Sequence, residues 1–431
     1  MMKVDMQTVR PCRVKLIIKA DAAETRADFD AVMGRYMREG RVKGFRAGKA
    51  PRQVIEREYR QDIDGDIRQR LVSTLSRRAV EEHKLALVSM VDAADILFSP
   101  ETGISFVLIC DVAPEFKLPK YLNIPVKKNE PTVGDAEVDE RLTLLRNQVS
   151  KYEDGKPDGV VARGDVTRVD FTAVSNGKPL KDLAEEAAVF SEGTGFWMQV
   201  AEPEMIPGVS LALAGMKTGE EKIIKTQFPK DFRIAALQGV KAVYTIKLAG
   251  FRQMIPATDE ELCKQLGVAD IGTLREQLRE QMQRQAESDE KSRRQQAVID
   301  YLLKKTDFEL PESEMAQETN ATVQTMLRGI IKRGGTREDL EKNRDQLLTT
   351  ATNTTKDRLR LRYILARIGE DAKIQVTDDD LQKKLDLFAA QHQMAPQEMR
   401  GRIEKGYGIE TFRADVRNEQ TLEFLVNAAK G

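Results

Sequence analysis

The sequence predicts a multidomain α+β protein, in which a small α+β unit and a β-rich unit precede an extended all-α region with long helical arms. Three patterns predict this order. Residues 12–113 combine strand and helix periodicities, and residues 160–251 alternate apolar and polar side chains as half-buried strands do. After Thr258 the chain follows helical spacing almost throughout. A length of 431 residues is enough for about three domains.

The amino-acid composition excludes several kinds of architecture, binding site and partner. Charged residues make up 32% of the chain and aromatic residues 6%, which favours extended helical architecture over one compact globule. The formal net charge is zero, so any contact with RNA must come from a local basic patch. Two histidines are too few for a histidine-based zinc site, and three widely spaced cysteines form no disulfide framework. No apolar leader and no membrane-length apolar run are seen, so we expect a cytoplasmic protein without metal, cofactor or membrane partner.

The first unit reads as strand, helix, helix, strand. Residues 12–19 form the first strand, and residues 22–39 form a helix that Gly40 ends as a left-handed C-terminal glycine. The second long helix has an apolar stripe of Ile63, Ile67, Leu71 and Leu75. Residues 104–112 alternate strictly, as a half-buried strand does. An extended connector follows, punctuated by Pro114, Pro119, Pro125 and Pro131, and it leads into a helix over residues 138–149.

Alternation defines the β-rich unit, and capping residues define the helices after it. The alternating apolar positions are Val169, Phe171, Ala173, Ala242, Tyr244, Ile246 and Leu248. Thr258 caps a short helix, residues 273–305 form one long helix, and residues 336–368 form another. Further helices begin at Pro311, Thr377 and Pro396. Methionines could line an adaptable apolar surface or simply pack between helices; they are Met282, Met315, Met326, Met394 and Met399.

Residues 44–51, Gly-Phe-Arg-Ala-Gly-Lys-Ala-Pro, join the first two helices as a glycine-bracketed loop. Phe45 has little core available, because its neighbours are the basic residues Arg41, Lys43, Arg46, Lys49 and Arg52. One interpretation is a presented loop, cationic with an apolar tip, that contacts an anionic and partly apolar partner. The other is that Phe45 folds back between the helices. The loop is one residue short of a phosphate loop and has Ala50 at the magnesium position, so no nucleotide site is expected.

The run Gly44-Phe45-Arg46-x-Gly48-Lys49 resembles the ribosome-docking loop of the trigger factor family, bacterial chaperones of the nascent-chain exit, although Ala47 stands where a basic residue is common. The resemblance extends in order and spacing over essentially the whole chain. It implies that these five matching residues bind the ribosome, at exit-tunnel protein and ribosomal RNA. It also implies nascent and unfolded polypeptides as partners, and a weak homodimer away from the ribosome.

Residues 159–251 resemble an FKBP-type peptidyl-prolyl cis-trans isomerase domain. The implied pocket consists of Phe171, Met205, Ile206, Val209, Phe232 and Tyr244. Rotating an X–Pro bond crosses a barrier of ~18–20 kcal/mol, and a dry aromatic pocket can favour the twisted amide without proton transfer. Val209 and Ala188 stand where the family commonly has aromatic residues. The alternatives are therefore a peptide-binding cleft with weak isomerisation and an ordinary barrel core.

The resemblance implies a ribosome-binding domain at residues 1–113, a linker and helix at 114–158, an FKBP-like isomerase domain at 159–251 and a helical, client-cradling domain at 252–431. The expected function is that of an ATP-independent chaperone that docks at the ribosomal exit tunnel and shields nascent chains. Two alternatives stay open: a prolyl isomerase whose helices are a scaffold, and a SurA-like holdase that does not bind ribosomes. The basic loop argues against the second.

Overall fold

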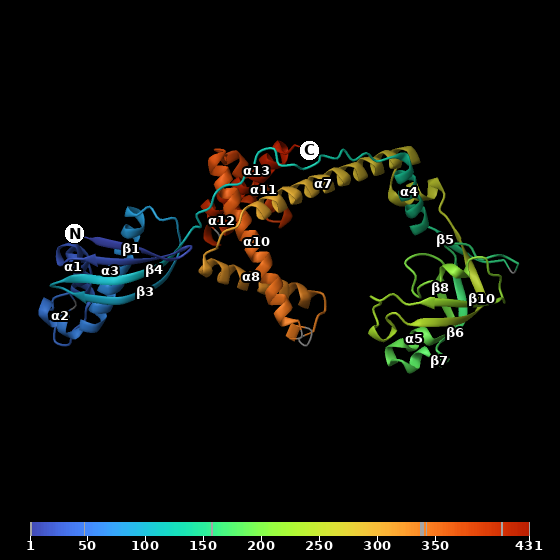
Figure 1. The fold of residues 1–431 in the computed structure, drawn as a ribbon, viewed down its shortest axis with the longest axis horizontal. Coiled ribbons are helices and arrows are strands. Elements are labelled where there is room, and N and C mark those ends of the chain that lie inside the picture. The colour runs from blue at the N-terminus through green and yellow to red at the C-terminus, as the bar shows by residue number, and fades with distance from the viewer. Residues whose placement is uncertain are drawn as a thin grey trace. The chain divides into compact units, whose positions relative to one another are not determined.

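The computed structural model describes residues 2–46, 48–156, 158–336, 340–341, 343–406 and 408–430 (Figure 1). The chain forms two compact units, one made of Met1–Asn129 with Lys291–Gly431 and the other of Glu130–Glu290. Ala47, the departure from the loop pattern, lies outside the described residues. The multidomain α+β class predicted from the sequence is confirmed, with an N-terminal α+β domain, a β-rich domain and a helical C-terminal region.

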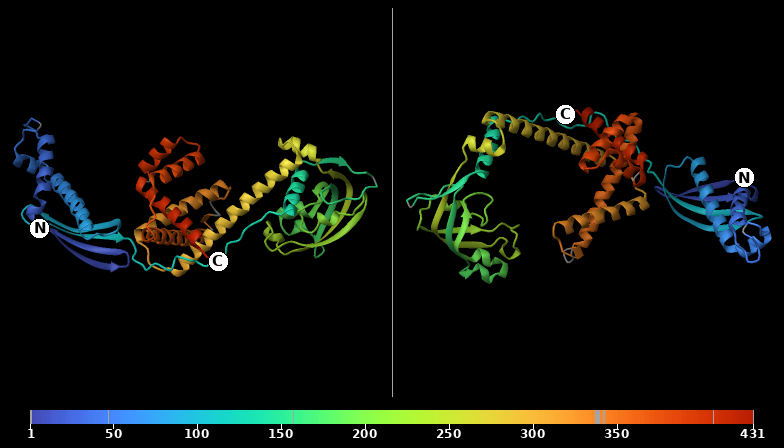
Figure 2. Two further views of the ribbon diagram at one scale, coloured as in Figure 1. Left: turned by 90° about the horizontal axis from the view of Figure 1, so that it is seen from above. Right: turned by 180° about the vertical axis from the view of Figure 1, so that it is seen from behind.

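The N-terminal domain is a four-stranded antiparallel sheet in the order β1-β2-β4-β3, with helices on one face (Figure 2). The strands are β1 (Lys3–Arg10), β2 (Arg13–Ala20), β3 (Leu87–Ser99) and β4 (Gly103–Val112). The helices are α1 (Ala22–Glu39), α2 (Arg52–Glu58) and α3 (Arg60–Glu82). Alternate residues of β2 and β4, including Leu16 and Phe106, pack with Ile67 and Leu71 of α3 in one core.

The predicted order of strand, helix, helix, strand is wrong for this domain, because it lacks β1 and β3 and counts α2 and α3, which meet at Tyr59, as one helix. β1 and β3 are the two edges of the sheet. All but one residue of β1 are exposed, and three register shifts interrupt β3, so neither strand shows regular alternation. The prediction succeeded for β2, β4, α1 and α3, because each buries one side against the same core.

The predicted role of Gly40 also needs correction. Gly40 ends α1, but its φ of −63° and ψ of 133° are extended and not left-handed. A Cβ atom at this position would lie 2.5 Å from the carbonyl oxygen of Tyr36 and 2.9 Å from Cδ1 of Ile55. Close packing of α2 against the end of α1 therefore requires the glycine.

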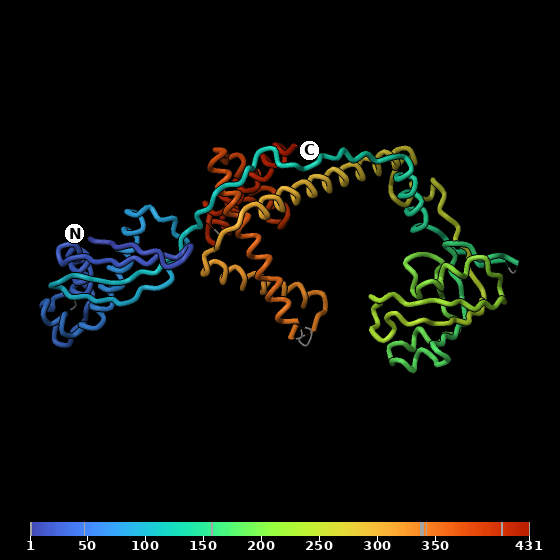
Figure 3. The backbone as a smooth tube through the Cα atoms, in the orientation of Figure 1, coloured from blue at the N-terminus to red at the C-terminus, as the bar shows by residue number. Residues whose placement is uncertain are grey.

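Residues 113–134 form the expected connector, without a helix or strand, and Figure 3 shows them as an extended trace. The connector is held to the helical body, since Ile124 and Val126 are buried against helices and Phe116 stacks on Phe308 at 4.2 Å between ring centroids. The helices are α7 (Ile271–Lys305), α8 (Glu312–Lys332), α10 (Arg344–Asp371), α11 (Asp378–Gln391), α12 (Pro396–Gly406) and α13 (Ile409–Ala428).

These helices agree closely with the predicted starts at Pro311, Thr377 and Pro396, and α7 with the predicted long helix. The helix predicted over residues 336–368 is described as α10 from Arg344 onward. Residues 337–339 and 342 lie outside the described residues.

The second unit contains a six-stranded sheet in the order β5-β10-β6-β7, with β8 paired to β6 and β9 paired to β10. The strands are β5 (Lys151–Asp154), β6 (Val166–Ser175), β7 (Lys178–Pro179), β8 (Glu192–Gln199), β9 (Glu221–Gln227) and β10 (Lys241–Ile255). The predicted alternating residues of β6 and β10 are all buried in its core. Helices α4 (Asp135–Gln148) and α6 (Asp259–Leu266) form a separate small core with the first part of α7, through Leu142, Leu262 and Leu274.

Candidate functional site

Two hydrogen-bonded turns shape the loop between α1 and α2. The amide of Phe45 donates to the carbonyl oxygen of Val42 at 3.0 Å, and the amide of Lys49 donates to that of Arg46 at 2.9 Å. Gly44 and Gly48 have φ values of +94° and +75°, in the left-handed region that favours glycine. The two glycines therefore allow the backbone to turn at both positions, and the loop that they bracket carries the side chains of Phe45 and Arg46.

The base of the loop is fixed to the core of the N-terminal domain. Ala50 and Ile55 are buried, and the ring of Tyr59 packs against that of Tyr36 at 5.6 Å between centroids. The Tyr59 hydroxyl bonds to the backbone of Arg41, where the loop begins. The base of the loop is therefore packed against the helices that flank it.

The structure places Phe45 at the tip with 45% of its surface exposed, so the alternative in which Phe45 folds back between the helices is wrong. The side chains of Arg46 and Lys49 are exposed, and neither makes an ion pair within the described part of the chain. By contrast, Arg52 at the start of α2 pairs with Glu56 at 2.7 Å. The tip therefore combines an apolar ring with uncompensated positive charge, which suits a partner that is both anionic and apolar.

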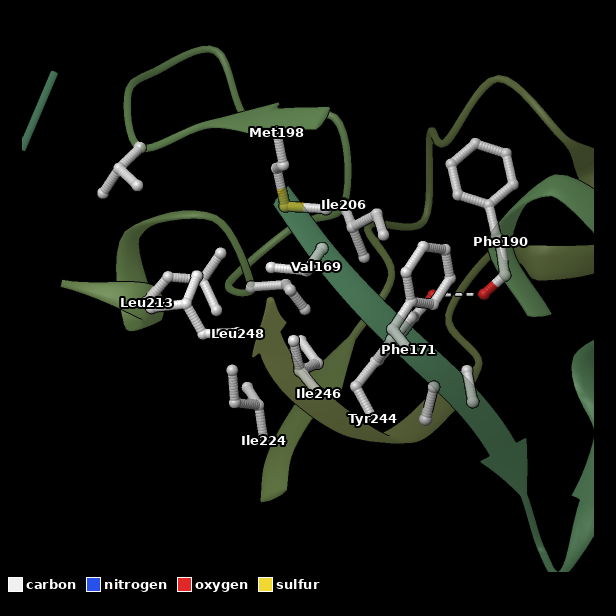
Figure 4. Packing of buried hydrophobic residues seen from close by; sticks show 14 of the residues in the cluster. Val169, Phe171, Phe190, Met198, Ile206, Leu213, Ile224, Tyr244, Ile246 and Leu248 are labelled. Carbon is white, nitrogen blue, oxygen red and sulfur yellow. Dashed lines mark hydrogen bonds between the residues drawn. The ribbon is translucent and has the colours of Figure 1, made fainter. Parts of the chain in front are cut away.

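In the second unit, five of the six predicted pocket residues lie in or against one hydrophobic core, namely Phe171, Ile206, Val209, Phe232 and Tyr244. Tyr244 of β10 is fully buried, and its hydroxyl donates a hydrogen bond of 2.9 Å to the carbonyl oxygen of Phe190 (Figure 4). Burial raises the pKa of the Tyr244 phenol, so the group stays neutral. Phe171 lies 6.0 Å from the Tyr244 ring and packs edge-to-face on Phe196 at 5.8 Å.

Phe190 is the central residue that the sequence analysis missed. Its ring meets Phe232 at 5.6 Å and Phe228 at 6.2 Å, both edge-to-face, and the guanidinium of Arg233 lies over it at 5.2 Å. Ala188 was expected at this wall position, but it is exposed at the first residue of the short helix α5 (Ala188–Ser191). Phe190 is the only aromatic residue between Phe171 and Phe196, and that signal could have identified it.

The predicted pocket residues differ in accessibility. Ile206, Val209 and Tyr244 are fully buried, and Phe171 nearly so. Met205 is 38% exposed and Phe232 is half-buried. Phe171, Ile206, Val209 and Tyr244 therefore belong to the core of the domain, and Met205 and Phe232 are the two that a ligand could contact. An apolar surface that covers a proline ring can favour the twisted amide, and this rotation requires no acid or base.

The helical region exposes apolar surface around α8. A hollow of about 590 Å³ lies between α8 and α10, lined by Thr325, Met326, Gly329, Ile330, Lys332, Arg333 and Leu347. Of the other methionines considered, Met315 lines a second hollow near the start of α8, while Met282, Met394 and Met399 pack within helical cores. Met315 and Met326 therefore line open hollows, whereas Met282, Met394 and Met399 pack between helices.

Within the described residues, no group of three or more His, Cys, Asp or Glu side chains is placed to hold a metal ion. Nor does any helix in that part of the chain have the length and apolar character needed to cross a membrane.

Three family models match the chain in sequence order. Residues 2–145 match the model for bacterial trigger factor protein, and residues 270–427 match the model for its C-terminus. Residues 159–249 match the model for FKBP-type peptidyl-prolyl cis-trans isomerase. The two trigger factor models together account for more than half of the chain.

Curated relatives resemble the chain over most of its length. The trigger factor of Opitutus terrae is 29% identical over 384 residues, which is 88% of this chain and 87% of that protein. The trigger factor of Gluconobacter oxydans is 26% identical over 417 residues, covering 95% and 91%. A solved structure from work on promiscuous substrate recognition by the trigger factor chaperone aligns over 99% of both chains, with a TM-score of 0.51 and 17% identity. That structural likeness concerns the fold alone.

Proposed function

Because the chain belongs to the trigger factor family of chaperones, we propose that it docks at the ribosomal exit tunnel and shields nascent polypeptides without using ATP. The observation that carries this proposal is the half-exposed ring of Phe45 in the same short loop as the exposed cations Arg46 and Lys49, which are unpaired among the residues that the structure describes. An RNA surface attracts the two cations, and an apolar patch of ribosomal protein can bury the ring. Gly44 and Gly48 hold the backbone that presents these three side chains.

Docking through this loop would compensate for weak binding of clients. Emerging chains expose apolar segments before they can fold, and such segments aggregate. The hollow beside Met326 and Ile330 offers open apolar surface for them. A tethered chaperone meets its client at high effective concentration, so modest affinity is enough. Release needs no nucleotide, since folding of the client buries the groups that were held.

The proposed division of labour follows the four parts expected from the sequence. Residues 1–113 bind the ribosome at exit-tunnel protein and ribosomal RNA, residues 114–158 link the parts, residues 159–251 act on prolyl bonds, and residues 252–431 cradle nascent and unfolded chains. The proposal includes a cytoplasmic location and a weak homodimer away from the ribosome.

The FKBP-type domain favours prolyl isomerisation as a second activity. The supporting feature is the aromatic core of Phe171, Phe190 and Tyr244, together with the accessible Met205 and Phe232 of the same domain. A proline-limited refolding assay tests it: Phe232→Ala should slow catalysis strongly, while Val189→Ala, at an exposed position of α5, should not. If both variants catalysed refolding at equal rates, these residues would be ordinary core residues of the barrel without a role in catalysis.

Co-sedimentation with ribosomes tests the docking proposal. The Phe45→Ala/Arg46→Ala variant should lose co-sedimentation while it still prevents aggregation of denatured protein. Leu97→Ala is the matched control, because Leu97 is 72% exposed on β3 of the same domain. Wild-type binding should weaken as salt rises, as cationic contacts to RNA do. If the double variant sediments like the wild type, the docking role is refuted and the general holdase becomes the better account.

A further inference from the structure

The first turn of α8 rests on one end of the N-terminal sheet. Oδ2 of Asp111, in β4, accepts a hydrogen bond of 3.0 Å from the amide of Ser313, 202 positions along the chain. The Ser313 hydroxyl lies 2.7 Å from that of Ser89 in β3. At the turn between β1 and β2, the thiol of Cys12 donates to the carbonyl oxygen of Glu309 at 3.2 Å. Three strand ends of the sheet thus meet the chain that enters α8.

Asp111 supplies a helix cap that α8 does not supply for itself. The first amides of a helix have no partner within it, and a side-chain oxygen of the N-cap residue usually accepts one of them. The N-cap residue of α8 is Pro311, which has no such oxygen and makes no side-chain cap. The carboxylate of Asp111 takes over this role, and its negative charge also suits the positive end of the helix dipole.

The capping carboxylate is buried and held in a fixed position. Its side chain is only 1% exposed, and Arg13 binds both oxygens, with Nε 2.6 Å from Oδ1 and a terminal nitrogen 2.9 Å from Oδ2. Burial alone would raise the pKa of Asp111, but the hydrogen bonds from Arg13 and Ser313 outweigh it and lower the pKa to about 2. Glu312 also pairs with Arg13 at 3.3 Å and with Arg10. The contact is therefore small and built from charged and polar groups.

We propose that Asp111 is a latch between the N-terminal domain and α8. When the latch is closed, one carboxylate neutralises Arg13 and caps α8, so the domain and the helix move together. When it opens, the first turn of α8 loses its cap and the N-terminal domain moves independently of the helical body. A contact made by charged and polar groups is expected to open reversibly, because relative motion of domains is the rule unless their interface is large and hydrophobic. The latch is independent of the proposed ribosome contact and lies in a different part of the domain.

Hydrogen–deuterium exchange of the full chain tests the latch. Asp111→Ala should speed exchange in the first turn of α8 by about fivefold, the loss typical of a missing helix cap. Exchange at the turn between β1 and β2 should rise with it, since both sides of the contact are released together. Asp28→Ala is the matched control: it removes a carboxylate that pairs with Arg70 at 2.7 Å in the same domain but does not contact α8.

A second variant covers the case in which an unpaired Arg13 disturbs the sheet. Arg13→Met/Asp111→Leu replaces the ion pair with apolar side chains of similar size, which proteins often tolerate well. The amides of β2 and β4 should then stay protected while the first turn of α8 still exchanges about fivefold faster. If that turn keeps its wild-type protection in this double variant, Asp111 does not act as a latch.

Discussion

The hydroxyl of Tyr59 donates a hydrogen bond of 2.8 Å to the carbonyl oxygen of Arg41 and accepts one of 3.0 Å from the amide of the same residue. This pair of bonds lies where the chain leaves α1 and the exposed loop begins. The phenol therefore satisfies both polar groups of a loop residue and joins them to the start of α3.

Tyr59→Phe removes both bonds while keeping the ring that packs on Tyr36. The backbone of Arg41 is solvent-accessible, so the loss in stability should be about 1 kcal/mol. The looser loop must then be ordered on binding, so the dissociation constant for ribosomes should rise about two- to tenfold. Tyr152→Phe, in β5 of the other unit, should leave it unchanged. If Tyr59→Phe bound ribosomes with the wild-type dissociation constant, the two hydrogen bonds of Tyr59 would not be needed to hold the loop for binding.

Replacing Gly40 and replacing Gly65 by alanine should change the stability of the N-terminal domain in opposite directions. At Gly40 the new Cβ meets the backbone of Tyr36, and Gly40→Ala should destabilise the N-terminal domain by ~1–3 kcal/mol. Gly65 lies inside α3, and a Cβ atom there would have open space around it, so Gly65→Ala should stabilise the domain by up to ~1 kcal/mol. Amide exchange of β2 and β4 in urea measures both. If Gly40→Ala stabilised the domain as Gly65→Ala does, helix propensity and not close packing would determine the effect of the substitution at Gly40.

The buried hydrogen bond from Tyr244 to Phe190 should contribute measurably to the second unit. Tyr244→Phe leaves the carbonyl of Phe190 without this donor, which should cost ~1–3 kcal/mol. Trp197 is the only tryptophan of the chain and lies in β8, so its fluorescence reports unfolding of this unit selectively. Tyr152→Phe, which removes an exposed contact to Gln199, is the control. An unchanged unfolding midpoint for Tyr244→Phe would contradict the structural role of the bond.

Acid should weaken the N-terminal domain through Asp111. Its pKa of about 2 in the folded protein lies below the ordinary value of 3.8, so the folded state binds fewer protons than the unfolded state. The carboxylate therefore contributes about 2 kcal/mol above pH ~4, and this contribution is lost as the pH falls from about 4 to about 2. Comparing the acid unfolding of wild type with Asp111→Asn isolates it. Parallel pH profiles for the two proteins would rule out this contribution.

Elements with one buried side were the predictable part of the fold. The four core elements of the N-terminal domain and the alternating residues of β6 and β10 all bury one regular face, and the sequence shows that periodicity directly. The edge strands β1 and β3 were not predicted, because β1 is exposed at all but one residue and register shifts interrupt β3, so neither buries a regular face. Their position is decided by pairing with β2 and β4.

The sequence predicts those parts of the candidate site whose residues lie close together along the chain. Phe45 and its basic neighbours stand out because they lie within a few positions of one another. The space that requires Gly40 depends on Ile55, and the packing of Phe190 depends on Phe228 and Phe232 from a later segment of the chain. The cap that Asp111 makes on Ser313 joins residues 202 positions apart, and no local pattern records such a pair.

Site-specific photo-cross-linking can show whether the ring of Phe45 meets the ribosome. A photoreactive phenylalanine analogue at position 45 retains an aromatic ring at the loop tip, and the same analogue at Leu97 provides an exposed control in the same domain. We expect a cross-link from position 45 to a ribosomal protein when ribosomes are present, and none from position 97. Irradiation that yields no ribosomal adduct from position 45, or equal adducts from both positions, would contradict docking through this loop.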